Sequence, residues 1–241
     1  MRLDINICFT ALVTESVYGV EEYETMKHKI DLTKEEEQRA LDLHRRFIFV
    51  NGLDSTPLEE SDETYFSKLL ESGITAVNTT IYAYPMKAGL TGPLHEILDA
   101  IAIWYSKVER SSTAIIATSV DDIRTAKKNG RFAVILGTQN GDFLMSTDMV
   151  KVFRRLGLRI VQPTYQRRNT IGDGCGERNP AGLSQFGVKL VEELNKQGIV
   201  IDLSHVGKGT TMDCINVSRD PVIISHTCLL YTSPSPRDRT R

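Results

Sequence analysis

The sequence lacks the long apolar runs that mark membrane spans and secretion signals. It contains no stretch of about 18 apolar residues, so we expect no transmembrane helix. Residues 1–18 contain no clean apolar core, which argues against a signal peptide. The four cysteines are scattered and form no CxxC pair, so neither a zinc knuckle nor a disulfide framework is expected. These features together predict a reduced, cytoplasmic location.

Neither positive nor negative charge predominates in the sequence. The net charge is −2, and no basic stripe marks a surface for nucleic acid. No GxGxxG or GxxxxGK[ST] motif follows an apolar run, which removes the usual signs of nucleotide binding. What the chain does have is 241 residues with 41% hydrophobic content, enough for one α/β barrel or two ordinary globular domains.

Short β-branched runs alternate with amphipathic segments along most of the chain. The predicted strands are residues 47–51, 75–81, 132–137, 159–164, 199–203 and 222–226. They are apolar throughout, as parallel strands covered on both faces are. Strand–helix–strand repeats with right-handed crossovers give either a doubly wound sheet or a closed barrel, and the missing nucleotide motifs favour the barrel. We therefore predict an α/β fold, a (β/α)8 TIM barrel truncated after about six strands.

Helix punctuation and composition suggest three regions. Residues 1–25 have no convincing periodicity and are treated as an N-terminal extension, whereas Thr33 and Glu36 form a capping box in the segment that follows. Further helix starts are predicted at Ser61 and Ser119. Residues 228–238 read CLLYTSPSPRD, which resembles the translation of a common sequencing adapter. We therefore expect an incomplete barrel domain over residues 26–227 and a non-native tail over residues 228–241.

Polar residues follow several of the predicted strands, and in barrels of this type the chemistry lies at the carboxyl ends of the strands. The run 199–203 leads into His205, and the run 222–226 ends in His226. One histidine at a strand end is usually structural, but two on neighbouring strands can bind one metal ion, with zinc the standard choice. The remaining histidines, His28, His44 and His95, are expected on the surface.

Other candidates stand at the same edge. Gln139 follows the third predicted strand, and Tyr165 follows the fourth. Tyr165 opens a polar loop, residues 166–180, that contains Asp173. A loop of this kind is either a wall of the substrate cleft or a solvated insertion, and the sequence leaves both readings open.

With these residues in place, residues 47–227 resemble the membrane (renal) dipeptidase family, the M19 metallopeptidases. The resemblance is carried by four motifs: GDGC at 172–175, GLSQFG at 182–187, GIVIDLSHV at 198–206 and PVIISH at 221–226. It implies a (β/α)8 barrel that hydrolyses dipeptides with a two-zinc centre, in which the metals polarise the scissile carbonyl and lower the pKa of a bound water.

Carried over by position, His205 and His226 fall on the family's two histidine ligands. The chain departs elsewhere, because Leu53 and Ser55 occupy the positions of the family's first-strand histidine and aspartate, with Asp54 between them. Gln139 replaces the bridging glutamate, and a neutral amide cannot replace an anionic bridge between two cations. Tyr165 stands at a histidine position near the substrate.

We therefore expect zinc, as one ion or two, and the replacements at Leu53, Ser55 and Gln139 favour one. Its predicted ligands are His205 and His226, with Asp54 joining them if the register shifts by one residue. Gln139, Tyr165 and Asp173 are expected to line the substrate or to support the ligands. The predicted function is a metal-dependent dipeptidase with an altered metal centre. The alternatives are an inactive barrel used for binding and a different amidohydrolase reaction. The expected partners are a dipeptide or related small amide and, in assembly, a second copy of the chain, with no nucleic acid.

Overall fold

The computed structural model describes residues 32–83 and 92–226. The predicted N-terminal extension, the predicted tail at 228–241 and His28 lie outside the described residues. The strands are β1 (Val50–Asp54), β2 (Ala76–Tyr82), β3 (Ala114–Ile116), β4 (Phe132–Thr138), β5 (Leu158–Val161) and β6 (Val200–Ile201). The helices are α3 (Lys34–Arg46), α4 (Glu63–Glu71), α5 (Pro93–Glu109), α6 (Val120–Lys128), α7 (Thr147–Arg155), α8 (Gln185–Gln197) and α9 (Lys208–Val217).

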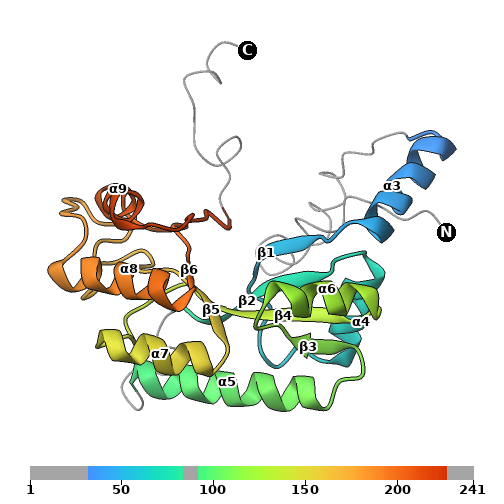
Figure 1. The fold of residues 1–241 in the computed structure, drawn as a ribbon, viewed down its shortest axis with the longest axis horizontal. Coiled ribbons are helices and arrows are strands. Elements are labelled where there is room, and N and C mark those ends of the chain that lie inside the picture. Colours follow the sequence, from blue (N-terminus) through green and yellow to red (C-terminus); the bar gives the residue numbers. More distant parts are fainter. Residues whose placement is uncertain (1–31, 84–91, 227–241) are drawn as a thin grey trace, which may run out of the picture.

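The strands form one curled, parallel sheet in the order β1-β2-β4-β5-β6 (Figure 1). The short strand β3 also pairs with β4, beside Phe132 to Val134, while β5 pairs with β4 further along, from Leu136 to Thr138. The runs predicted from the sequence are therefore spatial neighbours in chain order. The α/β barrel class is confirmed, as a parallel part-barrel within the described residues.

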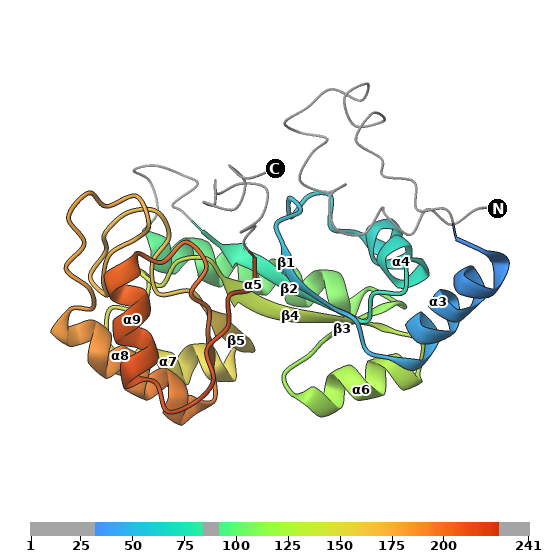
Figure 2. The ribbon, with the colours of Figure 1, turned by 90° about the horizontal axis from the view of Figure 1, so that it is seen from above.

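Alternate residues of the central strand β4 face two different cores. Val134 and Leu136 belong to the larger core, which lies under helices α4, α5, α7 and α8. Ala133 and Ile135 face the other side of the sheet, where α6 contributes Ala126. Figure 2 shows α5 and α6 on opposite sides of the strands. Burial on both faces explains why these strands read as continuous apolar runs.

Several strand limits predicted from the sequence were wrong. The first strand begins at Val50 and not at residue 47, because α3 continues to Arg46 and its C-cap is Phe47. The strand predicted at 159–164 is β5, which ends at Val161, two residues before Pro163, and proline has no N–H to donate to a neighbouring strand. The segment 222–226 forms only a parallel bridge from Ile223 to Asp202 rather than a full strand. The sequence pattern missed β3, which has only three residues.

The helix signals were more reliable than the strand limits. Thr33 and Glu36 form the predicted capping box, and Ser119 accepts a hydrogen bond from the backbone N–H of Asp122. The prediction of Ser61 as a cap was wrong: Asp62 caps α4, while Ser61 is buried and donates to the carbonyl of Pro57. In the part of the chain that the structure describes, no helix is both long and apolar enough to cross a membrane.

Candidate functional site

The structure brings together three ring side chains at the carboxyl ends of neighbouring strands. The ring centroids of His205 and His226 lie 4.9 Å apart, and the ring of Tyr165 lies 4.3 Å from that of His205. Residues far apart in the sequence thus meet because β5, β6 and the segment 222–226 run in parallel. This cluster is the candidate functional site.

One ring nitrogen of His226 has a hydrogen-bond partner, and the other has none among the described residues. Its Nδ1 lies 2.8 Å from the hydroxyl oxygen of Ser225. Its Nε2 is buried and has no hydrogen-bond partner among the described residues. Burial lowers the pKa of His226, against the opposing effect of Asp202, so the imidazole is neutral near pH 7. A neutral imidazole with a free nitrogen is the form that binds metals.

His205 is held in an unusual backbone conformation. Its φ is +59°, in the left-handed region that residues with a side chain rarely adopt. Its carbonyl accepts a hydrogen bond of 2.8 Å from the backbone N–H of Cys175, which fixes the turn. Burial also lowers the pKa of His205, with Asp202 again opposing. Backbone strain of this kind persists where the surroundings over-determine it, often at functional sites.

Asp202 organises the polar groups beneath the two histidines. Its side chain is buried, and Oδ1 accepts hydrogen bonds from the backbone N–H groups of Ser204 (3.0 Å) and Ser225 (3.1 Å). The hydroxyl of Ser204 also donates to Oδ1, at 2.9 Å, and the hydroxyl of Ser225 bonds to Oδ2. In the sequence, Asp202, Ser204 and Ser225 are distinguished only as parts of the motifs at 198–206 and 221–226. An aspartate at the end of an apolar strand was the available signal.

Asp54 lies buried at the end of β1. Its Oδ1 accepts hydrogen bonds from the backbone N–H and the hydroxyl of Thr56, at 3.0 and 2.7 Å, and Oδ2 is buried with no partner in the described part of the chain. In residues 32–83 and 92–226, however, no three His, Cys, Asp or Glu side chains form a group that could hold a metal. The structure therefore pairs the two histidines and does not join Asp54 to them.

Gln139 is buried and hydrogen-bonded at the end of β4. Its side-chain Nε2 donates to the hydroxyl of Thr80 at 3.0 Å, and its backbone carbonyl accepts from Nε2 of Gln162 at 2.7 Å. The residue follows the fourth strand in chain order, because β3 precedes it. Its amide thus lies in a neutral hydrogen-bond network that includes the end of β2.

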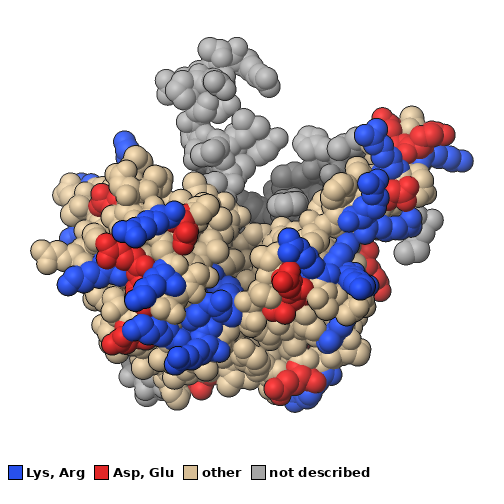
Figure 3. Space-filling model, in the orientation of Figure 1, with Lys and Arg blue, Asp and Glu red and all other residues tan. Residues whose placement is uncertain are grey.

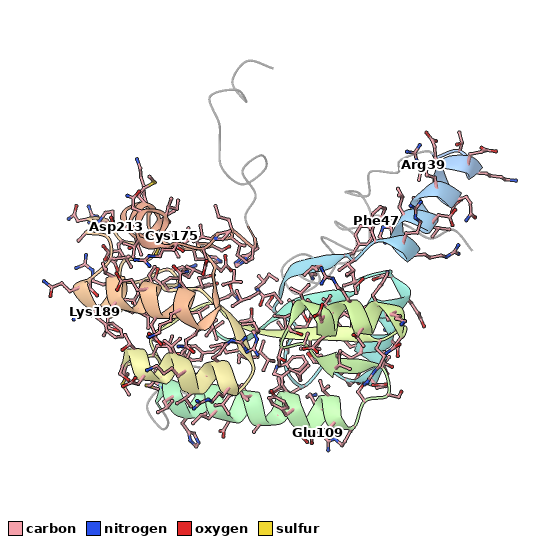
Figure 4. The ribbon with its side chains drawn as sticks, in the orientation of Figure 1. Arg39, Phe47, Glu109, Cys175, Lys189 and Asp213 are labelled. Carbon is pink, nitrogen blue, oxygen red and sulfur yellow. The ribbon has the colours of Figure 1, made fainter. Side chains whose placement is uncertain are left out.

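Asp173 anchors the long polar loop. Burial would raise the pKa of its carboxyl, but hydrogen bonds from Arg168 and from the backbone N–H groups of Ala181 and Gly182 outweigh burial and lower it. The loop is fastened to the turn of His205 by a bridge between Gly174 and Val206. Figure 4 shows Cys175 of this loop on the side of the molecule that carries α8 and α9, where Asp213 also lies. The loop is therefore packed, with its acid used internally.

A second polar network lies at the strand ends, and the sequence pattern did not predict it. The hydroxyl of Tyr82 donates to Asp142 at 2.8 Å, Asn140 donates to the same carboxyl at 3.1 Å, and Asn169 donates to Asn140 at 2.9 Å. Burial raises the pKa of Asp142. The network ties the end of β2 to the polar loop.

Two further histidines lie away from this cluster. His95 is exposed and pairs with Asp99, as a surface histidine should. His44 is half-buried on α3, and its ring stacks on Phe49 at 4.1 Å with its Nδ1 buried, so the surface prediction holds only in part. Lys, Arg, Asp and Glu are mixed over the face in Figure 3, so that face carries no continuous field of one sign.

Comparison with known proteins places the chain in a family. The model of the membrane dipeptidase family (Peptidase family M19) matches residues 22–238. The dipeptidase verJ of Clonostachys rogersoniana is 28% identical over 149 residues, which cover 60% of this chain and 38% of the length of verJ. Dipeptidase 3 of Mus musculus is 31% identical over 119 residues, covering 46% and 24%. The chain thus spans less than half the length of these curated relatives.

Solved structures agree on the fold. An amidohydrolase from Pseudomonas aeruginosa superposes with a TM-score of 0.70 at 34% identity, over 77% of this chain and 55% of that one. A metallo peptidase from Rhodobacter sphaeroides, liganded with a phosphinate mimic of the dipeptide L-Ala-D-Ala, gives 0.63 at 20% identity, over 75% and 65%, and supports the fold alone. Because the family model matches most of the residues, the chain belongs to the membrane dipeptidase family, peptidase family M19.

Proposed function

We propose that the chain carries the site of a metal-dependent hydrolase that cleaves dipeptides, with one zinc ion in place of two. The observation that carries the proposal is the pair of neighbouring imidazoles, His205 and His226, with Nε2 of His226 buried and bare. A buried polar atom without a partner is costly unless something binds it. Family membership supplies the reaction class.

The residues present fit a single ion better than a pair. Imidazole nitrogen is a standard zinc ligand, and the Nδ1 of His226 already has the hydrogen bond that such ligands make through their other nitrogen. A two-ion centre does not fit. It needs an anionic bridge, whereas Gln139 is neutral and Leu53 has no donor atom. A third ligand would come from Asp54, after a movement of β1, or from chain outside the described residues.

Zinc, when bound, would polarise the scissile carbonyl and make a bound water a better nucleophile. The chain's own residues hold the geometry around it. The fixed turn at His205 and the hydroxyl of Ser225 orient the two imidazoles, and Tyr165 forms a wall against His205. Preorganised groups of this kind add to catalysis because they need no rearrangement during the reaction.

A second candidate function is an inactive barrel that binds a partner without metal. It is favoured by the hydrogen bond from Gln139 to Thr80. Gln139 stands at the position of the family's bridging glutamate, and this bond places two neutral side chains there. The two candidates differ in metal content. An enzyme of the proposed kind binds zinc stoichiometrically, whereas an inactive barrel binds none.

The test is zinc content and dipeptide hydrolysis, measured on the same reconstituted samples. We expect about one zinc per chain for the parent protein, since the two imidazoles supply two of the ligands of a single ion. His226→Ala and His205→Gly should lose zinc and activity together, and His95→Ala, at an exposed contact with Asp99, should lose neither. Folded protein that takes up no zinc would overturn the proposal in favour of the inactive barrel.

A further inference from the structure

A chain of hydrogen bonds runs from a buried carboxylate to the ring of His226. The Oδ2 of Asp202 bonds to the hydroxyl of Ser225, and that hydroxyl oxygen lies 2.8 Å from Nδ1 of His226. The serine stands between the acid and the imidazole. The order therefore differs from that of a catalytic triad, in which the histidine stands between the other two.

The single hydroxyl proton decides the direction of this chain. A serine hydroxyl has one proton to donate and two lone pairs to accept with. The hydroxyl of Ser225 donates this proton to Oδ2 of Asp202. The bond to His226 must then run the other way, with Nδ1–H donating to the serine oxygen. A neutral imidazole carries one ring proton, which leaves Nε2 without one.

The surroundings hold this arrangement in place. The backbone N–H of Ser225 donates to Oδ1 of Asp202 at 3.1 Å, and the backbone N–H of His226 donates to the hydroxyl of Ser204 at 3.1 Å. The parallel bridge from Ile223 to Asp202 aligns the two segments. The Nε2 of His226 is buried and has no hydrogen-bond partner within residues 32–83 and 92–226.

We infer that Asp202 and Ser225 are positioning residues that fix the ring proton of His226 on Nδ1 and so keep Nε2 as the donor for a cation. The inference rests on the proposed function for what Nε2 binds, but not for the position of the proton. Mutation of a residue that hydrogen-bonds to a metal-binding histidine typically lowers the affinity for the metal about 10- to 100-fold.

The direct test is the ¹⁵N NMR spectrum of the His226 ring in metal-free protein, which distinguishes protonated from bare nitrogens. The parent protein should show a proton on Nδ1 and a bare Nε2. Ser225→Ala removes the accepting oxygen, so its ring should shift toward the Nε2–H form, and Ser225→Thr, which restores a hydroxyl, should return to the parent pattern.

Ser204→Ala is the matched control. Ser204 also donates a hydroxyl proton to Asp202, at 2.9 Å, and its hydroxyl oxygen lies 3.3 Å from that of Ser225, but it contacts the backbone N–H of His226 and not the ring. A purely structural role would make the two alanine variants alike. Positioning predicts that only Ser225→Ala changes the ring spectrum, and that it alone weakens zinc binding about 10- to 100-fold.

A proton on Nε2 in the parent protein, or identical ring spectra for the parent and Ser225→Ala, would overturn the inference. The readout needs no metal, so the two proposals can fail separately. A parent protein with Nδ1–H that never binds zinc would keep the positioning role and reject the hydrolase.

Discussion

The backbone carbonyl of Ser225 lies where a side chain at Gly52 would begin. A Cβ built on Gly52 would stand 2.5 Å from the oxygen of Ser225 and 3.5 Å from its Cα. Both groups are backbone, so neither can rotate away. The segment that carries His226 therefore packs directly against β1, and this approach requires a glycine.

Gly52→Ala should accordingly be destabilising. We expect a loss of about 1–3 kcal/mol in the free energy of unfolding, because an added methyl group forces the two segments apart. The measurement is urea denaturation at equilibrium. Gly92→Ala is the control, since a Cβ at Gly92 meets nothing within 4 Å. Equal stability of the two variants would show that the packing of Ser225 on β1 is absent in solution.

Replacing His205 separates the cost of its backbone from the role of its ring. Its φ of +59° suits glycine, and other residues pay about 1–2 kcal/mol for it. His205→Gly should therefore be more stable than His205→Ala by about 1 kcal/mol, although both lack the imidazole. Thermal melts of the two variants give the comparison. If the alanine variant is equally stable, the left-handed turn is not retained.

Gln139→Glu tests whether the missing anionic bridge alone prevents a second metal. The side chain is buried and pairs with Thr80, and no group of three metal-binding side chains forms within the described residues. We expect a loss of about 1–3 kcal/mol from burying a poorly partnered carboxylate, with zinc content still no higher than one per chain. Metal analysis beside a melting curve decides it. Two zinc ions with unchanged stability would contradict the single-ion site.

Glu63 should make the fold sensitive to acid. Hydrogen bonds from Ser111, Thr113 and Ser112 lower its pKa from 4.5 to about 2. Because the folded pKa lies below the unfolded one, the stabilisation is present above pH 4.5 and is lost as the pH falls toward 2. The carboxylate is exposed and screened by solvent, so we expect less than about 1 kcal/mol.

The measurement is the free energy of unfolding of Glu63→Gln and of the parent protein between neutral pH and acid. The difference between them should shrink as the pH falls through this window. Glu192→Gln, on α8, removes a carboxylate outside this cluster and serves as the control. A difference that is constant with pH would show that the hydroxyl groups do not hold the ionised form of Glu63.

The sequence alone determined the parallel α/β class and the histidines worth testing. Continuous apolar runs mark strands covered on both faces, and the caps at Thr33 and Ser119 are local hydrogen bonds that need only neighbouring residues. The motifs around His205 and His226 located the ends of two strands. These signals are short-range, so they can be read from the chain without knowing how it folds.

Only the tertiary structure decided how the site is held together. The order of the bonds from Asp202 through Ser225 to His226 depends on a bridge between segments about twenty residues apart, and the close approach of Ser225 to Gly52 depends on the curl of the whole sheet. The strand limits also depended on it, since a strand ends where its partner ends. Pairing and curvature arise between distant segments, and neither leaves a local pattern in the sequence.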